Sequence, residues 1–289
     1  MKHTEFKLES TDMRELHAER WEPETEPKAV VCIIHGLGEH IGRWKHVAEF
    51  LADNGYAVVA FDHFGHGKSP GKKGHANYDS ILLAIDDLLI ECNNFYKGKP
   101  RFLYGHSMGG NLVINYQMRY SQMIHGVIAS SPWLRLSFDP PKKKLALAKF
   151  MAGFYPKWSE PSEIDAEFVS RIPEEVKAYK NDPLNHAKIS AGLFFGTYDA
   201  GFFALRNTQK FHCPLLLMHG TGDNLTSYKA SEEFAEMLGD KATLKLFDGG
   251  YHELHNDLCR AEVLQTVKDW LDTQMQDLWH PDKALKKEE

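Results

Sequence analysis

A serine within a glycine-rich turn is the strongest sign of chemistry in this sequence. The segment GHSMGG (residues 105–110) follows a short apolar run, Arg101–Tyr104, and precedes a stretch with helical apolar spacing. A G-x-S-x-G pattern is weak alone, but between a strand and a helix it is typical of a nucleophile on a sharp turn. Glycine at positions 105 and 109 removes side chains that would crowd the reversal. We therefore predict that Ser107 is a nucleophile; the alternative is a serine that only caps the helix.

An acid for this serine should come later in the chain. A serine hydroxyl needs a general base, and the base needs an orienting partner. In proteins with a serine on such a turn, the acid and then the histidine come later along the chain. Asp223 ends the segment HGTGD (residues 219–223), directly after the apolar run Cys213–Met218. We predict that Asp223 is the acid; a turn-forming or capping role is the alternative, and Asp199 and Asp248 are weaker candidates.

The base is predicted from the segment GGYHELH (residues 249–255). His252 follows the apolar run Thr243–Phe247, and two glycines before it allow the loop to fold inward. We assign the base to His252. His255 lies three residues further on and could instead be solvated or cap a helix.

Acyl transfer also needs N–H donors aimed at the oxyanion of the tetrahedral intermediate. The amide of Met108, directly after the nucleophile, is one predicted donor. The second is predicted to be the amide of Leu37, because HGLG (residues 35–38) directly follows the apolar run Ala29–Ile34. We expect His35 to hold that loop and to take no direct part in the reaction.

The elements that must position these residues alternate along the chain. Continuous β-branched runs indicate strands covered on both faces, and the segments between them have helical spacing. Such alternation predicts an α/β fold with a mostly parallel sheet and helices on both faces. Two short alternating runs near the N-terminus, Glu5–Leu8 and Glu15–Trp21, predict an antiparallel pair. The predicted helices are 44–54, 78–95, 108–120, 228–238 and 260–270.

The alternation breaks between residues 133 and 206. This segment is rich in proline and too long for a simple loop. Leu145, Ala148 and Met151 repeat at helical spacing, which favours a helical cap over a linker. We therefore predict a core formed by residues 1–132 and 207–289, with residues 133–206 inserted as a cap or lid.

Composition excludes several classes of function. The 34 Lys and Arg against 40 Asp and Glu give a formal charge of −6, which argues against a nucleic-acid partner. The four cysteines show no spacing typical of zinc ligands, so we expect no metal. The polar N-terminus is not a signal peptide, and no run is long enough to span a membrane. We expect a cytoplasmic protein; the sequence leaves the oligomeric state open.

Six segments together resemble the monoglyceride lipase and lysophospholipase family of α/β-hydrolases. They occur in that family's order and span nearly the whole chain: HGLGEHIGRW (35–44), FDHFGHGKS (61–69), GHSMGG (105–110), NDPL (181–184), HGTGD (219–223) and YHELH (251–255). The resemblance implies an α/β-hydrolase fold without a cofactor. It also implies that Glu39, Arg43 and His255 bind the polar head of the substrate. Trp44 departs from the tyrosine that often follows this arginine.

The resemblance implies hydrolysis of monoacylglycerols through an acyl-enzyme. A lysophospholipase or a general carboxylesterase is the alternative within the same chemistry, and a non-catalytic lipid-binding module is the alternative outside it. The basic, amphipathic run 142–151 in the predicted cap is suited to contact with a lipid surface. It could equally pack its apolar side on the core.

Overall fold

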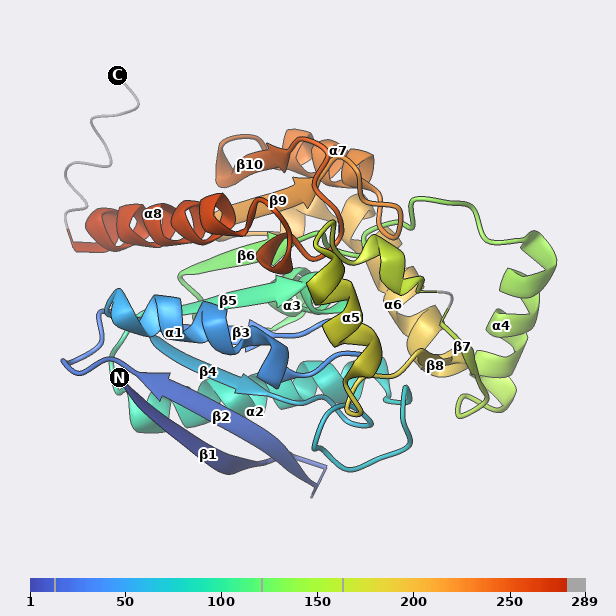
Figure 1. Cartoon of the computed structure of the whole chain (residues 1–289), viewed down its shortest axis with the longest axis horizontal. Helices are drawn as coiled ribbons and strands as arrows, with labels where there is room; N and C mark the ends of the chain where they lie inside the picture. Colours follow the sequence, from blue (N-terminus) through green and yellow to red (C-terminus); the bar gives the residue numbers. More distant parts are fainter. Residues whose placement is uncertain (13, 121, 163, 280–289) are drawn as a thin grey trace.

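The computed structural model describes residues 1–12, 14–120, 122–162 and 164–279. Within these ranges one sheet has eight strands in the order β1-β2-β4-β3-β5-β6-β9-β10 (Figure 1). β1 pairs antiparallel with β2, and β2 pairs antiparallel with β4, whereas the remaining pairs are parallel. The strands are β1 (Lys2–Glu9), β2 (Glu15–Glu22), β3 (Val30–Ile34), β4 (Ala57–Phe61), β5 (Arg101–His106), β6 (Gly126–Ser130), β9 (Leu215–Gly220) and β10 (Ala242–Phe247).

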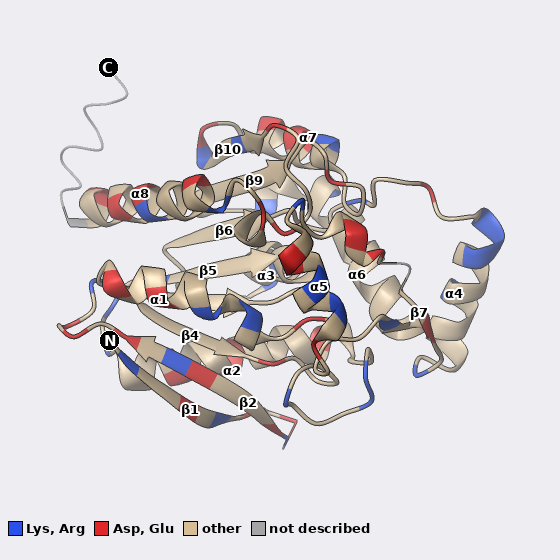
Figure 2. Ribbon diagram, viewed as in Figure 1, with Lys and Arg blue, Asp and Glu red and all other residues tan. Residues whose placement is uncertain are grey.

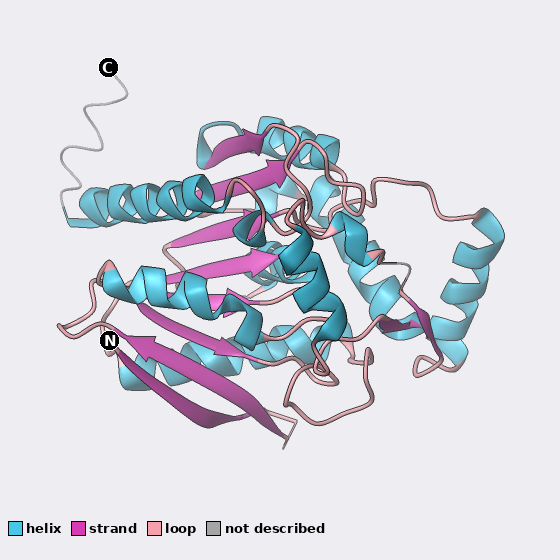
Figure 3. Ribbon diagram, viewed as in Figure 1, coloured by secondary structure: helices cyan, strands magenta, loops and turns pink. Residues whose placement is uncertain are grey.

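Helices cover both faces of this sheet because its central strands are apolar on both sides (Figure 3). Along β3, Cys32 faces one layer of helices and Val31 and Ile33 face the other. The first layer contains α2 (Tyr78–Phe95), α3 (Met108–Arg119) and α7 (Tyr228–Leu238). The second contains α1 (Lys45–Asp53) and α8 (Arg260–Trp279). Short 3₁₀ turns complete these elements: η1 (Ile41–Trp44), η3 (Thr208–Lys210), η4 (Gly239–Lys241) and η5 (Leu254–Asn256).

The predicted α/β fold is confirmed, including the antiparallel pair at the N-terminus. α8 runs past its predicted end at Trp270 because apolar side chains such as Leu271 and Met275 continue to face the core. Residues 280–289, which we placed in the core, lie outside the described part of the chain. In the described ranges no helix combines the length and the apolar character needed to cross a membrane.

Residues 133–206, here called the insertion, lie between β6 and β9. Their elements are α4 (Lys142–Phe154), β7 (Ser159–Pro161), η2 (Ala166–Phe168), α5 (Pro173–Asn181), β8 (Lys188–Ser190) and α6 (Ala191–Arg206). α5 lies near the carboxyl ends of the parallel strands, and α4 stands at the outer edge of the molecule (Figure 1). Leu193, Ala200 and Ala204 of α6 pack in the same core as α2 and α3. The insertion therefore shares part of its apolar core with the helices that cover the sheet.

Candidate active site

Ser107 sits on a tight turn between β5 and α3. Its backbone has φ 54° and ψ −115°, a conformation that L-residues rarely adopt and that often marks functional sites. The turn requires glycine at position 109, because a Cβ there would lie 1.9 Å from the carbonyl oxygen of Ile34. The tight packing of α3 against β3 thus brings Ser107 to the carboxyl end of the sheet.

The predicted acid and base meet at the same end. Asp223 follows β9 and His252 follows β10, and His252 Nδ1 donates to Asp223 Oδ2 over 2.7 Å. The other oxygen, Oδ1, accepts from the backbone amides of Leu225 and Thr226 at 2.8 and 3.0 Å. Because Nδ1 carries the proton in this bond, Nε2 of the neutral ring is left as the proton acceptor. This is the tautomer that a general base for a serine needs.

Charge and burial adjust both groups for this role. Burial would raise the pKa of Asp223, but the charge of His252 and hydrogen bonds from His219 and His252 hold it well below its usual value. Burial would lower the pKa of His252, but the charge and hydrogen bond of Asp223 outweigh burial and raise it. A carboxylate that stays ionised beside a basic imidazole is the arrangement expected of an acid–base pair.

The loop with the second predicted oxyanion donor lies against the serine. A Cβ on Gly36 would be 3.3 Å from Ser107 Cβ, so the chain passes close to the serine just before Leu37. Glu39 Oε1 accepts from the amide of Gly36 at 2.6 Å and thereby fixes the loop. Met108 begins α3, where the first N–H groups have no partner within the helix.

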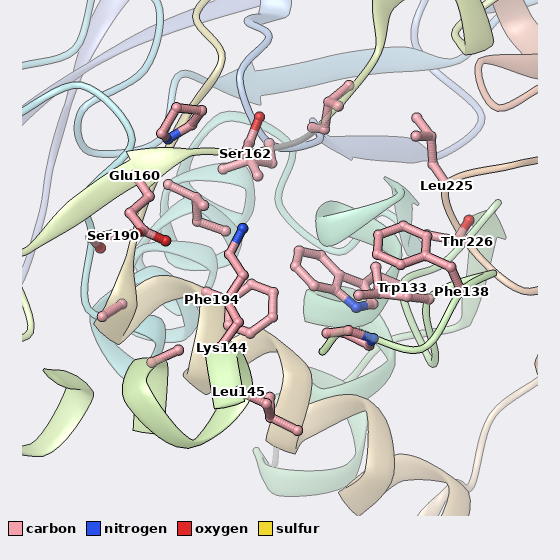
Figure 4. A pocket seen from close by; sticks show the side chains of 18 of the residues that line it. Trp133, Phe138, Lys144, Leu145, Glu160, Ser162, Ser190, Phe194, Leu225 and Thr226 are labelled. Carbon is pink, nitrogen blue, oxygen red and sulfur yellow. The ribbon is translucent and has the colours of Figure 1, made fainter. Parts of the chain in front are cut away.

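Two cavities share a wall at the serine. Both are lined by Leu37, Ser107, Ile164 and His252. The larger, about 910 Å³, is lined mainly by apolar side chains of the insertion and of the loop after β9, including Trp133, Phe138, Leu145, Phe194 and Leu225 (Figure 4). The smaller, about 250 Å³, has a polar side that includes Glu39, Tyr179 and Glu253. An ester held at Ser107 would therefore have an apolar space on one side and a polar one on the other.

Comparisons with known proteins agree with this geometry. The family described as serine aminopeptidase, S33, matches residues 25–259. A monoacylglycerol lipase of Mycolicibacterium smegmatis is 34% identical over 255 residues, which are 87% of this chain and 90% of that protein. The chain belongs to the monoglyceride lipase-like family of α/β-hydrolases.

Solved structures of this family superpose closely on the fold. The crystal structure of a monoacylglycerol lipase from Paleococcus ferrophilus has a TM-score of 0.84 and 36% identity, covering 90% of this chain and 99% of that one. A soluble variant of monoglyceride lipase from Saccharomyces cerevisiae, in complex with a substrate analog, has a TM-score of 0.81 at 25% identity, covering 94% of each chain. The chain also spans 28% of a longer, uncharacterised Dictyostelium discoideum protein with an abhydrolase domain, at 33% identity. The predicted family and the prediction of a carboxylic ester hydrolase are confirmed.

Of the three side chains expected to bind the polar head of a family substrate, Glu39 alone is placed in the lining of the smaller cavity. Arg43 lies behind that wall and makes a bidentate pair with Glu253, with Nη1–Oε1 and Nη2–Oε2 distances of 2.5 and 2.6 Å. His255 is fully buried and stacks on Trp44, with ring centroids 3.9 Å apart. Arg43 and His255 are thus not among the residues that line this cavity, and their contact with the substrate stays a prediction.

Glu253 and Tyr179 line this cavity, and sequence reasoning did not single them out. Glu253 directly follows the predicted base, which could have served as a signal. Tyr179 comes from α5 in the insertion, and its ring packs under the Arg43 guanidinium at 4.7 Å. Burial and the charge of Glu253 raise the pKa of Glu39 to about 7. Arg43, in contrast, holds the pKa of Glu253 below its usual value against the effect of burial.

The insertion is hydrogen-bonded to the loop that carries Leu37. The amide of His186 donates to the carbonyl of Gly38 over 2.9 Å. Gly38 has φ +78°, and a Cβ there would lie 2.3 Å from the carbonyl oxygen of His186. Nearby, His40 Nε2 and Asp182 Oδ2 are 2.9 Å apart. The segment 182–186 therefore acts as a strap that holds this loop in place.

One group of side chains elsewhere has the composition of a metal site. Glu5, His17 and Glu19 lie together on the β1–β2 hairpin, with donor atoms within 4.8 Å of one another. His17 Nε2 and Glu19 Oε1 already form a bond of 2.9 Å, and Lys68 Nζ lies 3.1 Å from Glu5. Both carboxylates thus already have partners within the protein, and we assign no metal to them.

The pKa of His252 predicts the pH dependence of turnover. As a general base His252 acts only when neutral, so kcat/KM should fall on the acid side with a midpoint above 6.5, the usual pKa of histidine. The titratable neighbours that contribute to this midpoint are Asp223, Glu253, Glu39, His106 and His255. Initial rates on a soluble ester between pH 5 and 9 would measure the midpoint, and a value below 6.5 would contradict the assignment.

Proposed function

We propose that this protein hydrolyses monoacylglycerols to a fatty acid and glycerol, with Ser107, Asp223 and His252 as catalytic triad. The observation that carries the proposal is the meeting of two unlike cavities at Ser107. The apolar cavity is lined mainly by hydrophobic and aromatic side chains, as is usual for small-molecule sites, and it therefore suits an acyl chain. The small polar cavity suits a glycerol head, whose hydroxyl groups both donate and accept hydrogen bonds.

The reaction follows from the tautomer of His252. Nε2 takes the proton of the Ser107 hydroxyl as its oxygen attacks the ester carbonyl, and Asp223 stabilises the imidazolium that forms. The amides of Leu37 and Met108 donate to the oxyanion. His252 then protonates the departing glycerol oxygen and leaves an acyl-enzyme. Water that gives a proton to His252 attacks this ester, and His252 returns that proton to the Ser107 oxygen as the bond to the acyl group breaks and the fatty acid leaves.

The polar cavity favours a neutral head group over a phosphate. Glu39 and Glu253 both line it, so the phosphate of a lysophospholipid would approach two carboxyl groups. Arg43 offsets the charge of Glu253 and is held by it, so this pair offers a phosphate no free cation, and Glu39 adds a further carboxyl group. Because the pKa of Glu39 is about 7, this carboxyl can donate as well as accept hydrogen bonds near neutral pH. Like-charge contacts of this kind discriminate against the wrong ligand.

A comparison of three substrates tests this proposal. We expect kcat/KM for 1-monooleoylglycerol to exceed that for oleoyl-lysophosphatidylcholine by about tenfold or more, since one buried like-charge contact costs over a kilocalorie per mole. The third substrate, p-nitrophenyl butyrate, reports the triad without filling the apolar cavity. Turnover of the short ester with none of either lipid would make the protein a general carboxylesterase. Failure of Ser107 to react with a fluorophosphonate probe would make it a binding module.

We further propose that the insertion acts as a cap whose helix α4 contacts anionic lipid surfaces. No residue of α4 is buried, and Leu147, Phe150 and Phe154 are 47, 65 and 79% exposed. Lys142 and Lys143 begin the helix, where its basic charge is concentrated (Figure 2). A basic helix with exposed aromatic side chains is suited to the interface of an anionic bilayer.

Vesicle sedimentation tests this surface. The protein should pellet with phosphatidylglycerol vesicles more than with phosphatidylcholine vesicles, and a Phe150→Ser/Phe154→Ser variant should lose most of that binding. Met123→Ser is the matched control, because Met123 is 68% exposed but lies outside the insertion. Equal binding by the double variant and the wild type would overturn the proposed contact. Turnover of p-nitrophenyl butyrate should be retained by both variants.

A further inference from the structure

The predicted catalytic acid, Asp223, contacts a second imidazole besides that of His252. His219, in β9, is fully buried, and its Nε2 lies 3.1 Å from Asp223 Oδ2. This is the same oxygen that accepts from His252 Nδ1 at 2.7 Å. Thr226 Oγ1 lies 2.9 Å from it as well. One carboxylate oxygen thus stands between two histidine rings, only one of which lines the cavity at Ser107.

The surroundings of His219 determine which of its nitrogens carries the proton. Nε2 faces two acceptors, Asp223 Oδ2 and the carbonyl oxygen of Thr226 at 3.3 Å, so Nε2 must carry a hydrogen. Nδ1 is then the acceptor, and it lies 2.8 Å from the hydroxyl of Ser231 in α7. The hydroxyl of Ser231 therefore donates to His219, which donates to Asp223. The order Ser231–His219–Asp223–His252 is one continuous chain of hydrogen bonds.

We propose that His219, held by Ser231, is a positioning residue that orients the Asp223 carboxylate and shares its negative charge with His252. This inference rests on the triad of the proposed function. A donor on the inner side of Oδ2 fixes the carboxylate plane, so that the base is held in one orientation. It also withdraws part of the carboxylate's charge, and hydrogen-bonded chains transmit such polarisation. Without His219 the full charge would act on His252 alone.

The two effects predict a distinct signature when the donor is removed. His219→Leu should lower kcat, because Asp223 loses a positioning contact. It should also move the acid limb of kcat/KM to higher pH, because the less shared carboxylate stabilises the imidazolium of His252 more strongly. His219→Gln can place an amide N–H near the position of Nε2 and should restore most of both properties. Ser231→Ala leaves the imidazole but not its anchor, and it should give a smaller change in the same direction.

The experiment measures initial rates on p-nitrophenyl butyrate from pH 5 to 9 for these three variants and the wild type. For His219→Leu we expect kcat to fall about tenfold to a hundredfold, well short of the ~10⁴-fold that loss of a triad acid's function costs. KM should change by less than about twofold, since His219 does not reach the cavity. The acid midpoint should rise by about half a pH unit.

Two controls make the outcome decisive. His125→Gln changes a half-buried histidine that accepts from the Arg101 amide at the start of β5, and it should leave kcat and the acid midpoint unchanged. The second control, Ser107→Ala, should be inactive. If this variant were as active as the wild type, the proposed triad would be wrong, which is a separate result from the role of His219. A folded His219→Leu with wild-type kcat and midpoint overturns the inference. A lower melting temperature with an unmoved midpoint also overturns it, because it indicates a purely structural role.

Discussion

Replacing Ser107 with alanine will lower kcat for ester hydrolysis by about 10⁶-fold, the loss typical when the nucleophile of a triad is removed. The other groups at the turn cannot substitute for the hydroxyl, because no acyl-enzyme forms without it. Asp223→Asn should cost less, on the order of 10⁴-fold, because the base and the oxyanion donors remain while the tautomer of His252 is lost. The ordering of the two variants is therefore part of the expected result.

Hydrolysis of 1-monooleoylglycerol and of p-nitrophenyl butyrate measures both losses. Alanine at position 107 keeps the backbone and the glycines around it, so thermal unfolding should stay close to that of the wild type. Ser80→Ala is the matched control, because Ser80 is a half-buried serine of α2 with no predicted role in the reaction, and this variant should keep full activity. If Ser107→Ala retained more than about a hundredth of the wild-type kcat, a different group would have to be the nucleophile.

Arg43→Met will cause the largest loss of stability that we expect from a single substitution near the site. The side chains of Arg43, Glu39 and Glu253 are 8, 3 and 4% exposed. Removing the one guanidinium leaves two carboxyl groups in the interior without a cation. Breaking a buried ion pair by deleting one partner typically costs about 3–5 kcal/mol. Urea unfolding at pH 8 should show a decrease of this size in the free energy of unfolding.

The pH dependence of this loss provides an internal check. Arg43 holds the pKa of Glu253 low in the wild type, and without it the pKa values of both carboxyl groups should rise in the folded protein. A folded state that binds more protons than the unfolded one loses stability as pH rises through the raised pKa values. The difference between Arg43→Met and wild type should therefore be smaller at pH 5 than at pH 8.

Two further variants decide whether the loss is electrostatic. Arg43→Met/Glu253→Gln should recover part of the lost stability, because one of the two unpaired charges is gone. Arg260→Met removes the exposed partner of Glu175, 3.3 Å away, and should cost less than about 1 kcal/mol. A loss below 1 kcal/mol for Arg43→Met, similar to that for Arg260→Met, would show that burial of this trio is energetically unimportant.

The sheet and the positions of Ser107, Asp223 and His252 at its edge could be predicted because local patterns determine them. Each residue comes from the turn or loop that follows an apolar run, and parallel strands bring their carboxyl ends to one side. The glycines at 105 and 109 then indicate the sharp turn, since a Cβ at 109 would collide with the carbonyl of Ile34 and a Cβ at 105 with the carbonyl of Gly109. A catalytic role that is predicted from such spacing depends only on the order of the strands and on the geometry of the turns after them.

The partners of Arg43 could not be predicted in the same way. The spacing of Glu39 and Arg43 favours a contact within one turn, yet Arg43 makes its bidentate bond with Glu253, which is 210 positions away. The sequence also does not predict that the ring of His219 contacts Asp223, because a histidine within an apolar strand is most simply interpreted as a core residue. Contacts between buried polar groups, whether 4 or 210 positions apart, depend on packing, which periodicity does not encode.

The strap between Asp182 and His186 has a consequence for engineering. Because the backbone of His186 is bonded to Gly38, the insertion and the loop that carries Leu37 are held together. A chimera that exchanges the insertion between relatives must carry residues 182–186 as a unit with a glycine at position 38. We therefore expect substitutions in α4, which has no buried residue, to be tolerated more readily than substitutions near α5.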